Sequence, residues 1–186
     1  MVVVQIEDDE IARFNRLVVP HLSDALTIAR WLTRNRADAD DVLQESCIRA
    51  FRSIGQLRDE NGRAWILAIV RNTAYTWLRK HRSKALVLVE DLAEQERIDA
   101  ELGADRAGAN DGNPETELIE QADAARLETA IQELPPHFRE VLVLRDMQGL
   151  EYREIAQVIG APVGTVMSRL ARARQKLIQL LKAEQP

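Results

Sequence analysis

The chain has 186 residues, of which 30% are charged and only 4% aromatic, and its formal net charge at pH 7 is −5. This length allows one or two small domains, and the composition favours a helical protein with thin aliphatic cores. A single cysteine, Cys47, excludes an internal disulfide, and no segment approaches the run of about 18 apolar residues that a membrane-spanning helix needs. The N-terminal segment lacks the basic start and long apolar stretch of a signal peptide. We therefore expect a cytoplasmic protein without membrane insertion.

The charge is distributed very unevenly along the chain. Residues 71–84 and residues 164–182 each carry five basic side chains and no acidic one, whereas residues 86–133 carry 14 acidic residues and three arginines. Such an asymmetry of sign is more informative than the total charge. Attraction to phosphates supplies most of the non-specific affinity for DNA. The sequence thus predicts two basic patches separated by an acidic connector.

The first part of the chain is predicted to be helical. Residues 8–34 form one or two helices that Pro20 interrupts, because proline cannot occupy a helix interior without loss of a hydrogen bond. The expected apolar faces consist of Ile11, Phe14, Leu17 and Val18 before the break, and of Leu22, Leu26, Ala29 and Leu32 after it.

A second helix is predicted over Asp38–Ile54, with acidic residues in its first turn that complement the helix dipole. The expected core stripe consists of Leu43, Cys47, Ala50 and Ile54, with Phe51 beside it. The opposite face carries Asp41, Glu45 and Arg49, with Gln44 alongside. Spacing alone favours a solvated face for these side chains. A metal or acid–base pair is disfavoured, because no histidine or third carboxylate lies at ligand spacing.

The next predicted helix, over Arg63–Lys84, follows a turn-rich loop at Leu57–Gly62. Its buried face is expected to consist of Ile66, Val70, Thr73, Ala74 and Trp77. A second row consists of Arg71, Tyr75, Arg79 and Arg82, with Asn72 and Trp77 nearby. Basic residues interleaved with aromatic rings suit single-stranded DNA, because the charges follow the backbone while the rings stack on unpaired bases. Composition alone leaves open whether Tyr75 and Trp77 belong to such a surface or to the core, whereas Trp65 is expected in the core.

The acidic connector, residues 85–116, is predicted to be a flexible linker, with a short helical piece around Val89–Leu102. Helical periodicity returns at Glu115. One helix is expected to be built on Leu118, Ala122, Ala125, Leu127 and Ile131, and the next, after Pro135 and Pro136, carries the apolar residues Phe138, Val141, Leu142 and Met147 and ends at Gly149.

The last part of the chain, from Leu150 to Leu181, has the pattern of a helix-turn-helix. Tyr152, Ile155, Ala156 and Ile159 form one apolar face of a short helix. Gly160 is expected to have a positive φ at the turn, and Pro162 suits the start of the following helix. The buried stripe of that helix is expected to consist of Val166, Leu170, Ala173, Leu177 and Leu180. Another face carries Thr165, Arg169, Arg172 and Lys176. Such a second helix lies in the major groove of DNA, and an ordinary helical hairpin with a basic face is the alternative.

Three segments carry a resemblance to a known family. They are DADDVLQESCIRAFR (38–52), RAWILAIVRNTAYTWLRKHR (63–82) and LPPHFREVLVLRDMQGLEYREIAQVIGAPVGTVMSRLARARQKL (134–177). Their order and sequence resemble the bacterial RNA polymerase sigma factors, most of all the small extracytoplasmic-function (ECF) group. The resemblance covers nearly the whole chain apart from the linker. It implies an all-α fold with an N-terminal helical domain (1–84), the flexible acidic linker (85–116) and a C-terminal helix-turn-helix domain (117–186).

The resemblance also implies a function and partners. The protein would bind core RNA polymerase, direct it to promoter DNA and assist melting of the duplex, and an anti-sigma factor would hold it inactive. The residues implied in polymerase binding are Asp38, Asp41, Gln44 and Glu45. Those implied in binding and melting the −10 element are Arg71, Asn72, Tyr75, Trp77 and Arg79, and the loop 57–62 would capture a base flipped from the duplex. Those implied in reading the −35 element are Thr165, Ser168, Arg169, Arg172 and Lys176.

The sequence departs from the family at Met167, where related proteins usually carry lysine or arginine, so one contact to DNA is expected to be missing. The unusual acidity of the linker suggests that it occupies a basic channel of the polymerase or keeps the free protein from binding DNA. An alternative function is that of a conventional helix-turn-helix regulator acting without polymerase. We expect no enzymatic activity, cofactor or metal, because no nucleophile–base set, phosphate-binding glycine loop or metal-ligand cluster is present in the sequence.

Overall fold

A computed structural model describes residues 2–58, 61–81 and 117–183. Every regular element within these ranges is a helix, which confirms the predicted fold class. The N-terminal bundle consists of α1 (Val2–Leu17), the 3₁₀ turn η1 (Val19–His21), α2 (Leu22–Thr33), α3 (Arg36–Ser53), the 3₁₀ turn η2 (Ile54–Gln56) and α4 (Gly62–His81). The C-terminal bundle consists of α6 (Glu117–Glu133), α7 (Pro136–Leu142), the π-helical turn η4 (Val143–Met147), α8 (Tyr152–Ile159) and α9 (Val163–Ala183). The predicted linker and its short helical piece lie outside the described residues.

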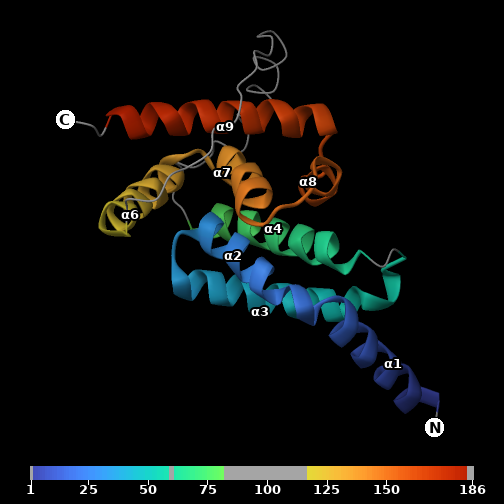
Figure 1. The fold of residues 1–186 in the computed structure, drawn as a ribbon. Coiled ribbons are helices and arrows are strands. Elements are labelled where there is room, and N and C mark those ends of the chain that lie inside the picture. Colours follow the sequence, from blue (N-terminus) through green and yellow to red (C-terminus); the bar gives the residue numbers. More distant parts are fainter. Residues whose placement is uncertain (1, 59–60, 82–116, 184–186) are drawn as a thin grey trace.

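The N-terminal bundle is built from α2, α3 and α4, each of which packs against the other two, while α1 extends away from them (Figure 1). The predicted break at Pro20 is confirmed, since η1 separates α1 from α2. Helix α3 begins two residues earlier than predicted because the side chain of Asn35 caps it, accepting a hydrogen bond of 3.1 Å from the backbone N–H of Asp38. Ile11, predicted on the buried face of α1, is 46% exposed.

The predicted core stripe of α3 is correct for Ala50 and Ile54, which are fully buried, and wrong for the residues nearer the start of the helix. The buried residues are Ala39, Val42, Ser46 and Ala50, whereas Leu43 and Cys47 are half-buried and Phe51 is 39% exposed. Ser46 can enter the core because its hydroxyl donates a 2.6 Å hydrogen bond to the carbonyl oxygen of Val42. A rule that reserves the core for apolar side chains therefore misses this residue. The buried face predicted for α4 is confirmed, apart from Trp77, which is half-buried.

The predicted helix-turn-helix is confirmed in the C-terminal bundle. Gly160 ends α8 in the left-handed region, with φ 66°, where a side chain would be strained. The N–H groups of Thr165 and Val166, in the first turn of α9, donate to the carbonyl oxygen of Pro162 at 3.0 and 3.2 Å. Val166 is fully buried between the two helices, as its predicted position requires.

The two predicted helices that precede the helix-turn-helix are present as α6 and α7, but some apolar residues of this segment are exposed. In α6, Ala125 is exposed and Leu127 is 40% exposed, whereas Ala130 and Ile131 are buried. In the second helix, Met147 is 51% exposed, because the chain leaves α-helical geometry at the π-helical turn η4 and the face of the helix rotates.

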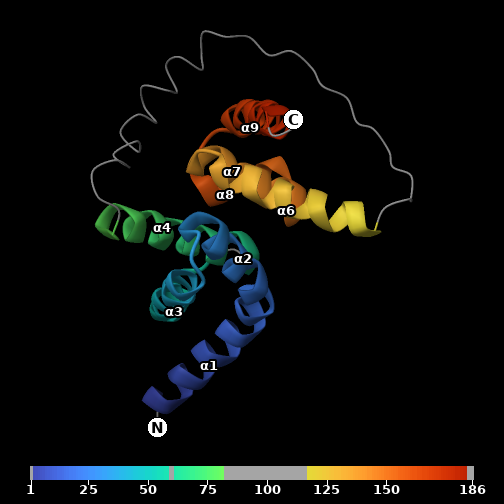
Figure 2. The same cartoon turned by 90° about the vertical axis from the view of Figure 1, so that its left-hand side faces the viewer.

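The two bundles pack against each other in layers (Figures 1 and 2). Helix α3 forms one outer layer, and α2 and α4 form the next. Helices α7 and α8 rest on α2 and α4, and α9 covers them as the opposite outer layer. This stacking places α4, which carries the first basic patch, at the contact between the two bundles.

Candidate nucleic-acid interface

The predicted −10 residues all lie on α4, but Trp77 and Tyr75 are two positions apart and point to different sides of the helix, and the exposure of the five residues differs. Asn72 and Arg79 are exposed, while Arg71, Tyr75 and Trp77 are half-buried. The indole of Trp77 stacks on the ring of His81, with centroids 4.5 Å apart. The guanidinium of Arg71 lies over the ring of Tyr75, 4.7 Å from its centroid, in a cation–π contact. The predicted residues therefore lie on one helix but on more than one of its faces.

Arg71 is bound to an acidic residue of the other bundle. Its Nε donates to Oε2 of Glu140 in α7 at 2.8 Å, and its Nη2 donates to Oε1 at 3.2 Å. Its Nη1 also donates to the side chain of Asn72 at 3.3 Å. Burial by itself lowers the pKa of Arg71, but the Glu140 carboxylate outweighs burial, and the net change in pKa is upward. The guanidinium is therefore firmly charged and doubly bound.

Tyr75 lies beneath the same contact. Its hydroxyl is buried and makes no hydrogen bond of normal geometry with the described residues. Burial, followed by the nearby negative charge of Glu140, raises the pKa of Tyr75 well above its ordinary value. The ring that is predicted to stack on an unpaired base is thus covered by the second bundle in this arrangement.

Glu140 also faces the recognition helix of its own bundle. Its side chain is fully buried, and its Oε1 lies 3.9 Å from Nη1 of Arg169 in α9. Arg169 is only 6% exposed, although the sequence pattern places it among the DNA-facing residues. One carboxylate therefore lies between an arginine predicted to bind the −10 element and another predicted to bind the −35 element.

The remaining predicted −35 residues lie nearer the surface of α9. Thr165, Ser168 and Arg172 are half-buried, and Lys176 is exposed. The hydroxyl of Ser168 donates to the carbonyl oxygen of Thr165 at 3.0 Å. Met167, where the sequence departs from the family, is 53% exposed on this helix. A larger side chain, polar or apolar, would fit at that position without disturbing the core.

The residues predicted to bind polymerase share the outer face of α3. Asp41, Gln44 and Glu45 are exposed and Asp38 is half-buried. Glu45 makes an exposed ion pair of 2.7 Å with Arg49, one turn further along the helix. Exposed pairs of this kind contribute at most about 1 kcal/mol. The face is therefore free to exchange these contacts for those of a partner.

Several polar residues at the junction of the bundles were not predicted from the sequence. Arg63 pairs with Asp24 at 2.8 Å and donates to the carbonyl oxygen of Gln148 at 2.8 Å. The side-chain amide of Gln148 donates to the carbonyl oxygen of Asp24 at 2.6 Å. Arg139, 2% exposed, also spans the junction. Nothing in their local sequence distinguishes them from solvated side chains, because their partners lie far away along the chain.

A second unpredicted feature lies on the surface of the helix-turn-helix. Arg174 of α9 is held by Asp146 of η4 through two hydrogen bonds, Nε to Oδ2 at 3.2 Å and Nη2 to Oδ1 at 2.5 Å. The pKa of Arg174 is raised, chiefly by its hydrogen bond to Asp146. This ion pair joins α9 to η4 and neutralises the charge of Arg174.

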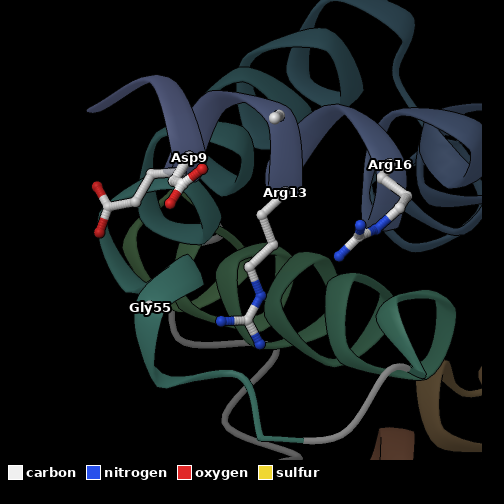
Figure 3. Close-up of a pocket in the computed structure, with 6 residues that line it drawn as sticks. Asp9, Arg13, Arg16 and Gly55 are labelled. Atoms are coloured by element: carbon white, nitrogen blue, oxygen red, sulfur yellow. The ribbon is translucent and has the colours of Figure 1, made fainter. Parts of the chain in front are cut away.

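A hollow of about 380 Å³ lies between α1 and η2, away from all of these residues (Figure 3). It is lined by Asp9, Glu10, Ala12, Arg13, Arg16 and Gly55. Arg13 extends across it, and its guanidinium donates to the carbonyl oxygen of Leu57. Among the described residues, no group of three or more His, Cys, Asp or Glu side chains is placed to hold a metal ion. A search of the same residues finds no helix long and apolar enough to cross a membrane.

Comparison with known proteins matches both bundles. The family model described as Sigma-70 region 2 matches residues 17–84, and that described as Sigma-70, region 4 matches residues 124–177. The chain is 34% identical over 165 residues to the ECF RNA polymerase sigma factor SigE of Mycolicibacterium smegmatis, covering 88% of this chain but only 60% of that protein. It is 30% identical over 177 residues to the ECF RNA polymerase sigma-E factor of Haemophilus influenzae, covering 94% and 90% of the two chains. It is 31% identical over 173 residues to the RNA polymerase sigma-H factor of Pseudomonas aeruginosa, covering 91% and 86%.

Solved structures show the same fold. The sigma factor RpoE from Bartonella quintana, solved in complex with the anti-sigma factor NepR, superposes with a TM-score of 0.62 at 24% identity over 92% of this chain and 98% of that one. CnrH, solved in complex with the cytosolic domain of CnrY, superposes with a TM-score of 0.61 at 25% identity over 92% of this chain and 88% of that one. The two family matches and the relatives that align over most of their length establish that this chain belongs to the ECF group of RNA polymerase sigma factors.

Proposed function

We propose that this protein binds core RNA polymerase, directs it to specific promoters and assists melting of the duplex, with each step carried by the residues named below. The observation that carries the proposal is the pairing, in one ECF chain, of a basic and aromatic row on α4 with a helix-turn-helix at α8 and α9. We divide the chain into an N-terminal domain (1–84), a linker (85–116) and a C-terminal domain (117–186). The family is one of transcription initiation factors and not a known enzyme family, and we propose no catalytic activity here.

The N-terminal domain is proposed to bind the −10 element through α4. Arg71, Asn72 and Arg79 would contact the DNA backbone, and Tyr75 and Trp77 would stack on separated bases. Stacking of a base on an aromatic side chain contributes about 1–3 kcal/mol and is available only once the base has left the duplex. Such contacts favour the melted state over the closed duplex. The loop 57–62 is proposed to receive a flipped base, although residues 59 and 60 lie outside the described part of the chain.

The C-terminal domain is proposed to read the −35 element through the first turns of α9. Thr165, Ser168 and Arg172 lie in the N-terminal half of this helix, the part that enters the groove in helix-turn-helix proteins, and the exposed Lys176, further along the helix, would bind a phosphate. Arg169 joins this set only when it leaves its position against Glu140. A bidentate arginine contact to guanine contributes about 1–3 kcal/mol of discrimination between bases.

Helix α3 is proposed as the docking surface for core polymerase, through Asp38, Asp41, Gln44 and Glu45. Three of these four side chains are exposed, and each can accept hydrogen bonds from a basic partner surface. We further propose that an anti-sigma factor regulates the protein, as the complex of one structural neighbour, RpoE, with the anti-sigma factor NepR suggests. Its place of action would be the cytoplasm, where promoter DNA and polymerase are found.

Transcription by purified core RNA polymerase on fragmented genomic DNA, with and without this protein, tests the proposal. New RNA starts preceded by a shared pair of −35 and −10 sequences would support it. The double variant Asp41→Asn with Glu45→Gln should lose most of this activity, and Asp40→Asn, an exposed acid of the same helix outside the proposed set, should retain it. No polymerase-dependent starts, together with tight binding of the isolated protein to duplex DNA, would instead indicate a conventional helix-turn-helix regulator.

A further inference from the structure

The contact between the two domains is centred on a carboxylate that is shared by both DNA-binding helices. Glu140 has no exposed side-chain surface, and it accepts two hydrogen bonds from Arg71 of α4 while facing Arg169 of α9. Arg71 and Glu140 are 69 residues apart in sequence and belong to different domains. A charge this deeply buried is stable only while it is paired. Its partner across the domain boundary therefore matters to the relative placement of the domains.

We propose that Glu140 is a latch: by binding Arg71 across the domain boundary it holds the free protein in a closed arrangement in which Arg71 and Tyr75, two residues of the proposed −10 surface of α4, are masked by the C-terminal domain. In this arrangement Arg71 cannot reach a phosphate, and the ring of Tyr75 cannot stack on a base. When the domains separate, water or DNA replaces Glu140 as the binding partner of Arg71. The assignment of Arg71 and Tyr75 to the −10 element rests on the proposed function above.

The closed arrangement has an internal cost that makes it releasable. The hydroxyl of Tyr75 and the side-chain oxygen of Gln148, both at the domain contact, are buried without a hydrogen-bond partner among the described residues. Both atoms would gain water on opening. The Glu140–Arg71 contact therefore has to offset the free-energy cost of burying these two groups. Loss of the contact should shift the equilibrium between the closed and the open form toward the open form.

The position of α3 leaves the proposed polymerase-docking face accessible in the closed arrangement. This helix lies on the far side of α2 and α4 from the C-terminal domain, so its exposed acidic face stays accessible while α4 is covered (Figures 1 and 2). Polymerase could thus dock on the closed protein before the domains separate. The masked residues of α4 would then become exposed after polymerase has docked on α3, and would stay covered in the free protein.

The latch can be tested by single-molecule fluorescence transfer in the full-length protein. Dyes would be placed at Arg52→Cys on α3 and Gln175→Cys on α9, both exposed positions on the two outer layers, in a Cys47→Ser background. Glu140→Gln removes the charge at nearly constant volume, and Glu133→Gln, an exposed acid of the same domain, is the matched control. Glu140→Asp keeps the charge, but its side chain is one methylene shorter and should not reach Arg71. This variant is used for the test if circular dichroism shows that Glu140→Gln does not fold.

We expect the low-transfer, open population to rise at least about fivefold in the Glu140 variant and to stay unchanged in Glu133→Gln. The apparent affinity for a single-stranded oligonucleotide should rise by the same factor, because apparent affinity scales with the competent fraction. An unchanged open population in a folded Glu140 variant would overturn the latch, even if the wild-type protein directs transcription. A larger open population without a gain in oligonucleotide affinity would overturn the masking of a DNA surface on α4, and wild-type transcription would show separately whether the sigma function stands.

Discussion

Arg139 of α7 crosses the domain boundary and donates from Nη1 to the backbone carbonyl oxygen of Trp31, in α2, at 2.8 Å. The same guanidinium, 2% exposed, donates to three carbonyl oxygens of its own domain, those of Ile131 at 3.1 Å, Gln132 at 2.6 Å and Leu134 at 2.7 Å. These carbonyls belong to the end of α6 and the turn that follows. Arg139 therefore closes the C-terminal end of α6 and joins the domains with one side chain.

Arg139→Lys should destabilise the protein by about 2–4 kcal/mol, because an ammonium cannot reach four divergent carbonyl oxygens and a buried acceptor left without its donor costs about 1–3 kcal/mol. Urea unfolding followed by circular dichroism would measure the change. Arg153→Lys, at an exposed position of α8, is the control and should alter stability by less than about 0.5 kcal/mol. Equal stability of the two variants would mean that the backbone contacts of Arg139 are dispensable.

Local patterns in the sequence were sufficient for the helix-turn-helix. Gly160, Pro162 and Val166 each have a role that depends on residues only a few positions away, so the turn and the buried contact follow from spacing. In α3 the sequence predicts the buried Ala50 and Ile54 but not Ser46, because a buried serine bonded to its own helix is indistinguishable in the sequence from a solvated one. Helix existence was thus predictable, but the orientation of an individual helix depended on hydrogen bonds that spacing does not encode.

The candidate site was only partly predictable for a related reason. The positions of the candidate residues on α4 follow from the sequence, but the contact of Arg71 with Glu140 of α7 does not. Glu140 is the single acid of α7, in the sequence PHFREVL, and nothing near it indicates a partner in the other domain, while Arg71 is one of several basic residues of α4. Their contact depends on how two domains separated by more than 30 residues outside the described ranges pack together. No periodicity within either helix carries that information.

Gly62 is predicted to be essential for the packing of α4 against the end of α1. A β-carbon at this position would overlap the carbonyl oxygen of Leu17 and lie 2.8 Å from its carbonyl carbon. Because the obstacle is backbone, Gly62→Ala should destabilise the protein by about 3 kcal/mol or more. Gly164→Ala is the control, since no atom lies within 4 Å of the added carbon, and alanine in the first turn of α9 should be neutral or stabilising. Thermal unfolding of both variants would decide, and a Gly62→Ala protein as stable as wild type would contradict the packing.

His137 is predicted to make stability depend on pH in the mildly acidic range. Burial, with the positive charges of Arg169 and Lys176, lowers the pKa of His137 from 6.5 to about 4. Above pH 6.5 the imidazole is neutral in both the folded and the unfolded state and has no effect. As the pH falls from 6.5 to 4, the unfolded state gains a proton that the folded state cannot accept, so the free energy of unfolding decreases.

The contribution of His137 to the pH dependence of stability can be separated from that of the carboxylates by comparing the wild type with a variant that lacks the imidazole. Urea unfolding at several pH values should show that His137→Gln loses less stability than the wild type between pH 6.5 and 4, with no difference in slope above pH 6.5. Parallel curves for the two proteins over the whole range would show that the imidazole is freely protonated in the folded state.

Met167→Arg is predicted to restore a DNA contact that this chain lacks. Met167 is 53% exposed on the recognition helix, so a guanidinium there can extend toward DNA without entering the core. One added phosphate contact should tighten binding to duplex DNA several-fold at low salt and steepen the dependence of log affinity on log salt by about 0.9. Ile178→Arg, on the same helix at 51% exposure and three turns further from its N-terminus, adds the same charge at a site that should lie beyond the groove. Fluorescence anisotropy over a range of salt concentrations should therefore separate the two variants. An equal gain for both would mean that α9 attracts DNA only through its total charge and that position 167 has no particular place in the groove.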